Sequence, residues 1–163
     1  PPPPPPPPPP PTTLLSSAAS DVYKRQDKYL ADLKKYSEEL GVLQNIRWEP
    51  GQENIENVYN ALDVLVSTSA FGEGFSNTLA EAMSCGVRCV ATDVGDARKI
   101  LSDTGVVVSP GDSSAVADGI LAILNSDERE HSKFTKLAID HIRKNFSIDQ
   151  LVSNTLNVFK NRL

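Results

Sequence analysis

The chain has 163 residues, of which 16 are basic and 21 are acidic, so its formal net charge is −5. This length is enough for one domain with a hydrophobic core. The acidic balance argues against a general nucleic-acid-binding protein, which would carry a basic patch. No apolar run in the sequence reaches the roughly 18 residues that a membrane-spanning helix needs.

The residue types that commonly bind metals are few. Cys85 and Cys89 match neither a C-x2-C motif nor a Cys/His quartet, so we expect two reduced thiols and no zinc site. His131 and His141 fall in a helix with a surface pattern, and we expect both to be solvated and not catalytic. The sequence therefore predicts neither a metal nor a cofactor.

The first 26 residues differ from the rest of the chain. Residues 1–11 are an unbroken proline tract, which can form only polyproline II and cannot join a core. Residues 21–26, DVYKRQ, resemble translated sequencing-adapter ends. We expect residues 1–26 to be a non-native or disordered leader and residues 27–163 to form a partial domain. A natural proline-rich docking arm is the alternative for the leader.

From Asp27 onward the sequence alternates between patterns typical of helices and of strands. The first half is predicted to contain a helix over 27–40, a short strand over 45–49, a helix over 53–60 and a strand over 62–66. The second half is predicted to contain helices over 76–85, 97–101, 114–124, 127–145 and 147–162, with strands over 87–91 and 106–108. This alternation predicts an α/β domain with a Rossmann-like parallel sheet and flanking helices.

Ligands bind at the carboxyl ends of the strands in such sheets. We therefore expect the loops over 67–74 and 93–96 to line one crevice. Between them lies EGFSNTLAEAM, residues 73–83, in which Glu73 and Glu81 are separated by seven residues. Since Glu81 is two residues beyond the apolar Leu79, it should point away from the core and toward this crevice.

The start of the 76–85 helix has the chemistry of an anion site. Its first N–H groups lack intrahelical acceptors and attract phosphate, and Gly74 lets a ligand approach the backbone. No P-loop lysine is present. Ionised carboxylates accept strong hydrogen bonds from vicinal hydroxyls, so the two glutamates suit a ligand with sugar, diphosphate and ribose in series. The alternative is that Glu73 is a solvated loop residue and Glu81 an exposed helix residue.

The run from Ala61 to Leu101, followed by TGVVVSPGD, resembles the donor-binding half of retaining glycosyltransferases of family four, which have the GT-B fold. The family motif is a glutamate, seven residues and a second glutamate, and Glu73 and Glu81 match it. The resemblance implies that Glu73 is the catalytic-site residue and binds hydroxyls of the donor sugar, while Glu81 binds the ribose. It also implies further donor-binding residues: Gly74, Phe75, Ser76, Asn77 and Thr78.

The resemblance also implies the substrate and the partners. The donor would be a UDP-, GDP- or ADP-sugar, with its base near Trp48, Glu49 and Pro50 and with no metal required. The sugar would pass, with retained configuration, to an acceptor glycan or lipid-linked sugar held by an N-terminal domain that this chain lacks. The isolated fragment would then be inactive. The family's acceptors at the inner membrane face fit a cytoplasmic protein with peripheral membrane association and no nucleic-acid partner.

Three features depart from the family. Arg88 stands where proline is usual, and we expect it to perturb the turn or to add a cation near the cleft. The usual Arg/Lys pair for the diphosphate is absent, because Arg98 and Lys99 are not at that position. The first strands of the donor domain are also missing, and the last helix would normally pack partly on the other domain. A non-enzymatic nucleotide-sugar-binding or scaffold module therefore stays the alternative.

Overall fold

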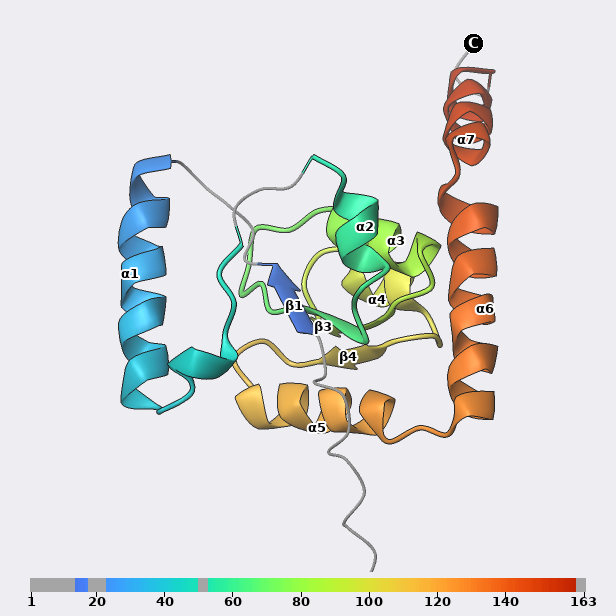
Figure 1. Cartoon of the computed structure of the whole chain (residues 1–163). Coiled ribbons are helices and arrows are strands. Elements are labelled where there is room, and N and C mark those ends of the chain that lie inside the picture. The colour runs from blue at the N-terminus through green and yellow to red at the C-terminus, as the bar shows by residue number, and fades with distance from the viewer. Residues whose placement is uncertain (1–13, 18–22, 50–52, 161–163) are drawn as a thin grey trace, which may run out of the picture.

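Four parallel strands form the sheet at the centre of the computed structural model, which describes residues 14–17, 23–49 and 53–160 (Figure 1). The strands are β1 (Leu14–Ser17), β2 (Val64–Ser67), β3 (Arg88–Thr92) and β4 (Val106–Val108), in the spatial order β1-β2-β3-β4. Each pairs in parallel with its neighbour. The predicted α/β fold with a parallel sheet is therefore confirmed.

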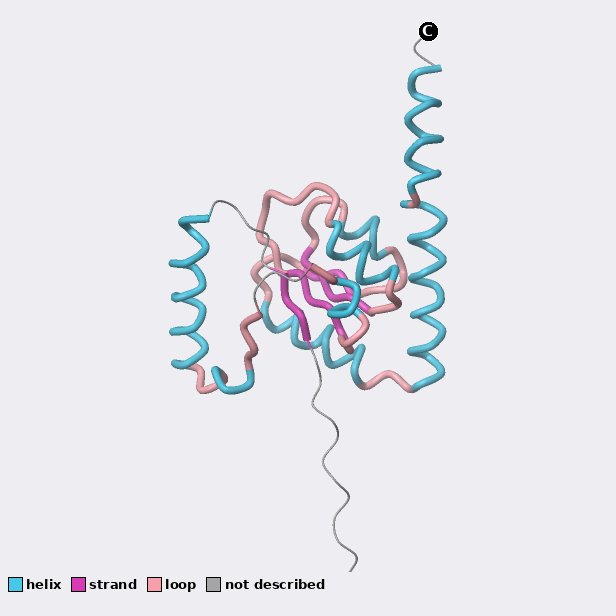
Figure 2. Tube along the Cα trace, turned by 45° about the horizontal axis from the view of Figure 1, so that its top comes forward, coloured by secondary structure: helices cyan, strands magenta, loops and turns pink. Residues whose placement is uncertain are grey.

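Both faces of the sheet are covered, because every residue of β2 and β3 is buried. Alternate residues point to opposite faces. On one face Val64, Val66 and Val90 pack with Ile123 of α5 (Ser113–Leu124). On the other face Leu65 joins a larger core built with helices. Figures 1 and 2 show the strands enclosed between α5 and the other helices.

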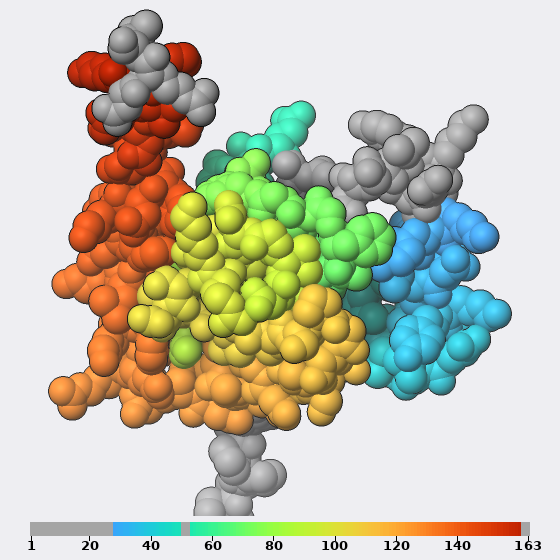
Figure 3. All heavy atoms as spheres, turned by 180° about the vertical axis from the view of Figure 1, so that it is seen from behind, coloured from blue at the N-terminus to red at the C-terminus, as the bar shows by residue number. Residues whose placement is uncertain are grey.

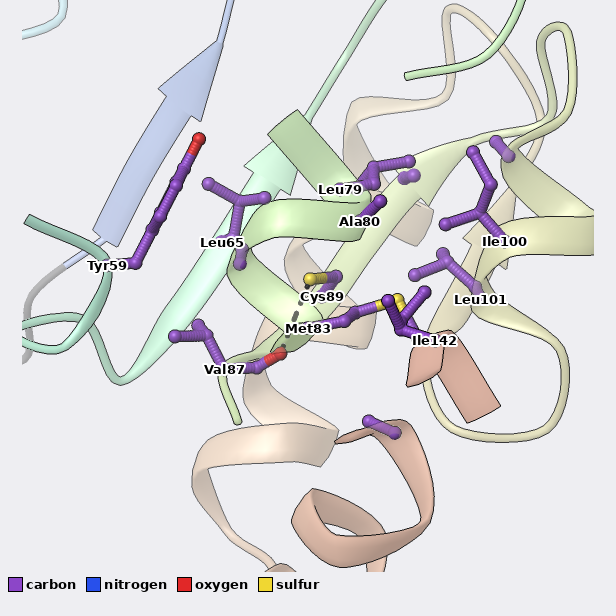
Figure 4. Packing of buried hydrophobic residues seen from close by; sticks show 14 residues of the cluster. Tyr59, Leu65, Leu79, Ala80, Met83, Val87, Cys89, Ile100, Leu101 and Ile142 are labelled. Carbon is purple, nitrogen blue, oxygen red and sulfur yellow. Dashed lines mark hydrogen bonds between the residues drawn. The ribbon is translucent and has the colours of Figure 1, made fainter. Parts of the chain in front are cut away.

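The larger core lies under α2 (Ile55–Tyr59), α3 (Asn77–Ser84), α4 (Ala97–Leu101) and α6 (Glu128–Phe146). Leu79, Ala82 and Met83 of α3 are at most 1% exposed, so the predicted inward face of this helix is confirmed. Figure 4 shows Leu79 and Met83 packed close to Ile100, Leu101 and Ile142. Gly86 follows α3 with φ of +84°, a conformation that glycine adopts without strain and that ends the helix.

Two elements lie inside the segment expected to be a leader. Residues Leu14–Ser17 form β1, which pairs in register with Val64–Ser67, and α1 (Tyr23–Glu39) begins before residue 27. The segment expected to be a non-native or disordered leader thus contains a strand and the start of a helix, while whether it is non-native stays a prediction. The proline tract lies outside the described residues, and the boundary at residue 26 stays a prediction.

The predicted strand over 45–49 is wrong. The structure has a 3-10 helix, η1 (Leu43–Asn45), followed by residues 46–49 without regular structure. A strand needs a neighbour for its backbone N–H and C=O groups. Because β2 pairs with β1 on one side and with β3 on the other, it offers no free edge to residues 46–49.

The helices at the two ends of the described chain leave apolar side chains in solvent. Tyr36 of α1 is 60% exposed, and Leu151 and Phe159 of α7 (Ile148–Lys160) are 66% and 64% exposed. Figures 1 and 3 show α1 and α7 on opposite sides of the molecule, with α7 projecting beyond the sheet. Within residues 14–17, 23–49 and 53–160, no helix is both long and apolar enough to cross a membrane.

Arg88 is not a cation near the predicted crevice. It begins β3 and so lies at the amino end of the strand, opposite the edge where ligands bind. Its guanidinium carbon lies 4.7 Å from the centroid of the Phe134 ring, and Nη1 donates to Ser126 Oγ at 3.1 Å. Burial lowers the Arg88 pKa, and the charge of Glu130 opposes this shift. The expectation of a cleft cation is therefore wrong, because the side chain packs on α6.

Candidate functional site

The loop that carries Glu73 is held by hydrogen bonds from the end of β3. The buried Thr92 donates through Oγ1 to the Ser69 carbonyl oxygen at 2.6 Å. Ser69 in turn donates through Oγ to Glu73 Oε1 at 2.9 Å. The half-buried Glu73 carboxylate is therefore oriented by its own loop, and its second oxygen is left to accept from a ligand.

The loop after β3 packs directly on the same backbone. A Cβ at Gly95 would lie 2.4 Å from the Gly74 carbonyl oxygen and 2.5 Å from that of Glu73, so only glycine fits there. The Asp96 N–H donates to the Gly74 carbonyl at 3.0 Å. The two loops predicted to line one crevice are thus in contact, and both follow the carboxyl ends of strands.

The start of α3 presents free backbone donors beside this loop. Ser76 has extended backbone angles, and its side chain makes no capping hydrogen bond. The first N–H groups of the helix, from Asn77 onward, have no acceptor within the helix itself. These groups and the helix dipole favour an anion at this position.

Glu81 lies on the second turn of α3 and, as predicted, points away from the core; its side chain is exposed. Its Oε2 accepts a hydrogen bond of 3.0 Å from the hydroxyl of Tyr59 in α2, which is 3% exposed. Burial and this hydrogen bond to the carboxylate raise the pKa of Tyr59 to about 12. The hydroxyl therefore stays protonated and keeps Glu81 in place, while the other carboxylate oxygen can accept from a ligand.

A cavity of about 650 Å³ opens between α3 and the end of α6. Phe75, Asn77 and Glu81 line its α3 side, and Arg143 and Phe146 are among the residues that line its α6 side. The rings of Phe75 and Phe146 lie 5.2 Å apart and tie the loop to α6. The structure thus brings three of the predicted donor-binding residues into one cavity, together with an arginine that sequence reasoning missed.

The other predicted site residues lie elsewhere. Glu73 and Gly74 lie in the loop against Gly95 and do not line this cavity. Ser76 is buried and Thr78 is half-buried. A second cavity of about 320 Å³ lies at the carboxyl ends of β2 and β3, where a crevice was expected, and it is lined by Thr68, Thr92, Gly111, Asp112, Ser113 and Val116. Thr68 belongs to the loop 67–74 predicted to line the crevice, whereas the contribution of residues 111–116 was not predicted. Of the residues 111–116, only Gly111 stood out in the sequence, as part of the turn signal Pro110-Gly111.

The predicted base site is described only in part. Trp48 is half-buried, and the ammonium nitrogen of Lys34 lies 5.7 Å from its ring centroid. Its indole Nε1 is buried and has no hydrogen-bond partner among the described residues. Glu49 is exposed, whereas Pro50 lies outside the described residues. The placement of the base therefore stays a prediction.

The thiols and imidazoles do not form a metal site. Cys85 and Cys89 are free thiols, and burial raises the pKa of Cys89 to about 12. His131 is exposed as expected, but His141 is half-buried, with Nε2 3.2 Å from the Lys99 carbonyl oxygen. The part of the chain that the structure describes holds no group of three or more side chains suited to a metal ion.

The sequence profile of the family described as "Glycosyl transferases group 1" matches residues 21–126. The chain is 31% identical over 124 residues to the lipopolysaccharide core biosynthesis mannosyltransferase LpsB of Rhizobium meliloti. It is 32% identical over 136 residues to the O-antigen chain mannosyltransferase B of Escherichia coli. These matches cover 74% and 83% of this chain but 35% and 34% of the relatives, so the chain spans about a third of their length.

Solved structures of glycosyltransferases with the GT-B fold resemble most of the chain. Anabaena HepE, solved in complex with UDP, superposes with a TM-score of 0.75 at 26% identity over 90% of this chain and 41% of HepE. The same protein was also solved with UDP-glucose. The C-terminal domain of a group 1 family protein from Francisella tularensis has a TM-score of 0.63 at 27% identity, over 77% of this chain and 66% of that domain.

Proposed function

Because the chain belongs to the group 1 glycosyl transferases, we propose that it is the donor-binding part of an enzyme that transfers a sugar from a nucleotide diphosphate. One observation carries this proposal: Glu73 lies in the loop before α3 and Glu81 on its second turn, and each carboxylate has one oxygen already held by a neighbouring hydroxyl. The complexes of HepE with UDP and UDP-glucose support the same ligand class.

In this proposal the two glutamates bind different parts of one donor. Glu73, fixed by Ser69, accepts hydrogen bonds from the hydroxyls of the sugar. Glu81, fixed by Tyr59, accepts from the ribose hydroxyls. The diphosphate lies between them, at the backbone N–H groups from Gly74 to Thr78, where the helix dipole favours negative charge. The role of these groups is to hold and orient the donor, and none of them requires a metal ion.

We further propose that the transfer itself needs more than this chain. The acceptor, a glycan or a lipid-linked sugar, would be held by the part of such enzymes that this chain does not cover. The leaving phosphate would then assist attack from the same face, which retains the configuration of the sugar. The chain alone should therefore bind the donor without transferring its sugar, in the cytoplasm or at the inner membrane face.

Calorimetric titration of the chain with UDP-, GDP- and ADP-sugars, and with the matching nucleotides, tests this assignment. Glu81→Ala should weaken binding of nucleotide and nucleotide sugar alike, by about 10-fold or more, since charge-assisted hydrogen bonds contribute about 1.5–3 kcal/mol. Glu73→Ala should weaken binding of the nucleotide sugar only. Glu38→Ala, which removes an exposed carboxylate on α1, should change neither.

The outcomes separate the parts of the proposal. If Glu81→Ala binds as tightly as the wild type, the ribose role is wrong. If the wild type binds none of the three donors, the function as a whole is contradicted. Detectable sugar transfer by the chain alone would contradict the proposed need for a further acceptor-binding part.

A further inference from the structure

We propose that Arg143 of α6 binds the diphosphate of the nucleotide sugar, an inference that rests on the donor-binding function proposed above. A diphosphate in the cavity would lie beside the Glu81 carboxylate, with Glu73 in the loop that precedes α3, in a chain whose net charge is already −5. Repulsion between like charges at such short range is substantial. A donor site with this composition therefore needs a nearby cation.

Among the side chains that the structure describes, the other cations near the site are already engaged or lie elsewhere. Arg98 pairs with Asp93, with Nη2 and Oδ2 2.6 Å apart. Arg88 is buried against Phe134 at the opposite edge of the sheet. Lys99 belongs to α4 and is not among the residues that line the cavity. Arg143 does line it, together with Asn77 at the start of α3 and Glu81.

The side chain of Arg143 is available for a ligand. It is exposed and makes no hydrogen bond or ion pair with the residues that the structure describes. Its backbone, in contrast, is well fixed: the preceding Ile142 is 7% exposed in the core, and Phe146, one turn later, contacts Phe75. Arg143 lines the same cavity as Asn77, the first residue of α3. A guanidinium on a fixed helix can bind two phosphate oxygens at once.

The alternative is a solvated arginine that only stabilises the end of its helix. Arg143 and Lys144 both lie in the last turn of α6, where cations interact favourably with the helix dipole. Lys144 shares the charge, the exposure and the position along the helix, but it does not line the cavity. Lys144→Ala therefore removes the same charge from the helix end as Arg143→Ala. It removes no contact with a ligand in the cavity, so the difference between the two variants measures that contact.

The test compares wild type, Arg143→Ala, Arg143→Lys and Lys144→Ala by titration with UDP, GDP and ADP and with the corresponding nucleosides. Arg143→Ala should weaken nucleotide binding by about 10- to 100-fold and leave nucleoside binding unchanged, since only the phosphate contact is lost. Arg143→Lys should fall in between, because it keeps the charge but loses the bidentate geometry. Lys144→Ala should bind like the wild type. A thermal melt of each variant verifies that it is folded; if Arg143→Ala is not, Arg143→Gln takes its place, and if Lys144→Ala is not, Lys144→Gln does.

Four results would overturn the inference, and only the last of them also contradicts the proposed function. If a nucleotide binds the wild type and Arg143→Ala equally well, Arg143 does not contact the phosphates, although the donor function stands. If nucleotide and nucleoside lose affinity equally, Arg143 acts through the fold of the cavity and not through the diphosphate. If Lys144→Ala weakens binding as much as Arg143→Ala, the effect comes from the general charge of the helix end. A wild type that binds no nucleotide contradicts the proposed function itself, and this inference with it.

Discussion

Ser69 positions the Glu73 carboxylate, although the two-glutamate motif does not include it. Its hydroxyl donates to Glu73 Oε1, and its carbonyl accepts from the buried Thr92. Glu73 is thus connected through Ser69 to the end of β3. On the other side Gly95 contacts the same loop so closely that no side chain fits. A glutamate held in this way loses little conformational freedom when a sugar binds.

Ser69→Ala should therefore weaken binding of UDP-glucose by about 5-fold, which corresponds to the roughly 1 kcal/mol that one hydrogen bond contributes. The affinity for UDP should not change, because UDP lacks the sugar that Glu73 is proposed to hold. Calorimetric titration with both ligands measures this difference. Ser69→Thr, which keeps the hydroxyl, should restore binding, and the exposed Ser114→Ala should have no effect. An equal loss for UDP and UDP-glucose would mean that Ser69 only maintains the loop.

At the scale of secondary-structure elements, α2 and α3 are joined through the second glutamate. Tyr59 is at the end of α2, buried against the core, and its hydroxyl reaches Glu81 Oε2 across the two helices. Figure 4 shows the Tyr59 ring beside Leu65 of β2. The orientation of Glu81 thus depends on how α2 packs, which links the proposed ribose contact to the protonation of one buried phenol.

This link makes the stability of the chain depend on pH in the alkaline range. The pKa of Tyr59 is about 12 in the folded chain, and about 10 in an unfolded one. The contribution to stability is fully present below pH 10 and is lost as the pH rises toward 12, because the unfolded state releases the proton first. Urea unfolding should show that this loss amounts to about 1 kcal/mol at pH 11. Tyr59→Phe should lack this decline, whereas the exposed Tyr36→Phe should retain it. Parallel pH profiles for wild type and Tyr59→Phe would refute the link.

Local patterns in the sequence predicted the elements around the site well. The helix at Ala97–Leu101 and the strand at Val106–Val108 have the expected bounds, and α3 begins one residue later than expected. The apolar face of α3 determines which side of the helix is buried, which is why the direction of Glu81 away from the core could be predicted. These features depend on side-chain periodicity within one element, which a sequence displays directly.

Features that depend on contacts between distant segments could not be read in the same way. Residues 45–49 have the composition of a strand, but the edge of β2 that could pair with them is occupied by Leu14–Ser17. Arg88 was expected to add a cation near the cleft. Its side chain instead points toward Phe134 and Ser126, which lie about 40 residues further along the chain. Arg143 carries no motif at all and becomes a candidate only because α6 packs beside α3.

At the scale of the whole molecule, the central strands are buried on both faces, whereas α1 and α7 leave apolar side chains exposed to solvent. The core between the sheet and α3, α4 and α6 is closed, with residues such as Leu65 and Ile100 fully buried. In α7, Ile148, Leu151 and Phe159 are 80%, 66% and 64% exposed. Apolar faces of this kind are uncommon on soluble monomers and usually mark contact surfaces. That this face packs on a second domain, as expected from the sequence, stays a prediction.

The uncovered face of α7 should therefore make the chain self-associate without contributing to its stability. Sedimentation velocity at increasing concentration should show dimers or larger species for the wild type, and monomers for a Leu151→Lys/Phe159→Lys double variant. At concentrations low enough for the wild type to be monomeric, the free energy of unfolding should change by less than about 0.5 kcal/mol, since both side chains are exposed in the folded chain and association no longer adds to stability. The matched control, Ser153→Lys/Asn157→Lys, adds the same charge at exposed polar positions of α7 and should associate like the wild type.

If both double variants reduce association equally, net charge and not the apolar face controls it. If the apolar variant loses stability instead, α7 packs on the rest of the chain in solution.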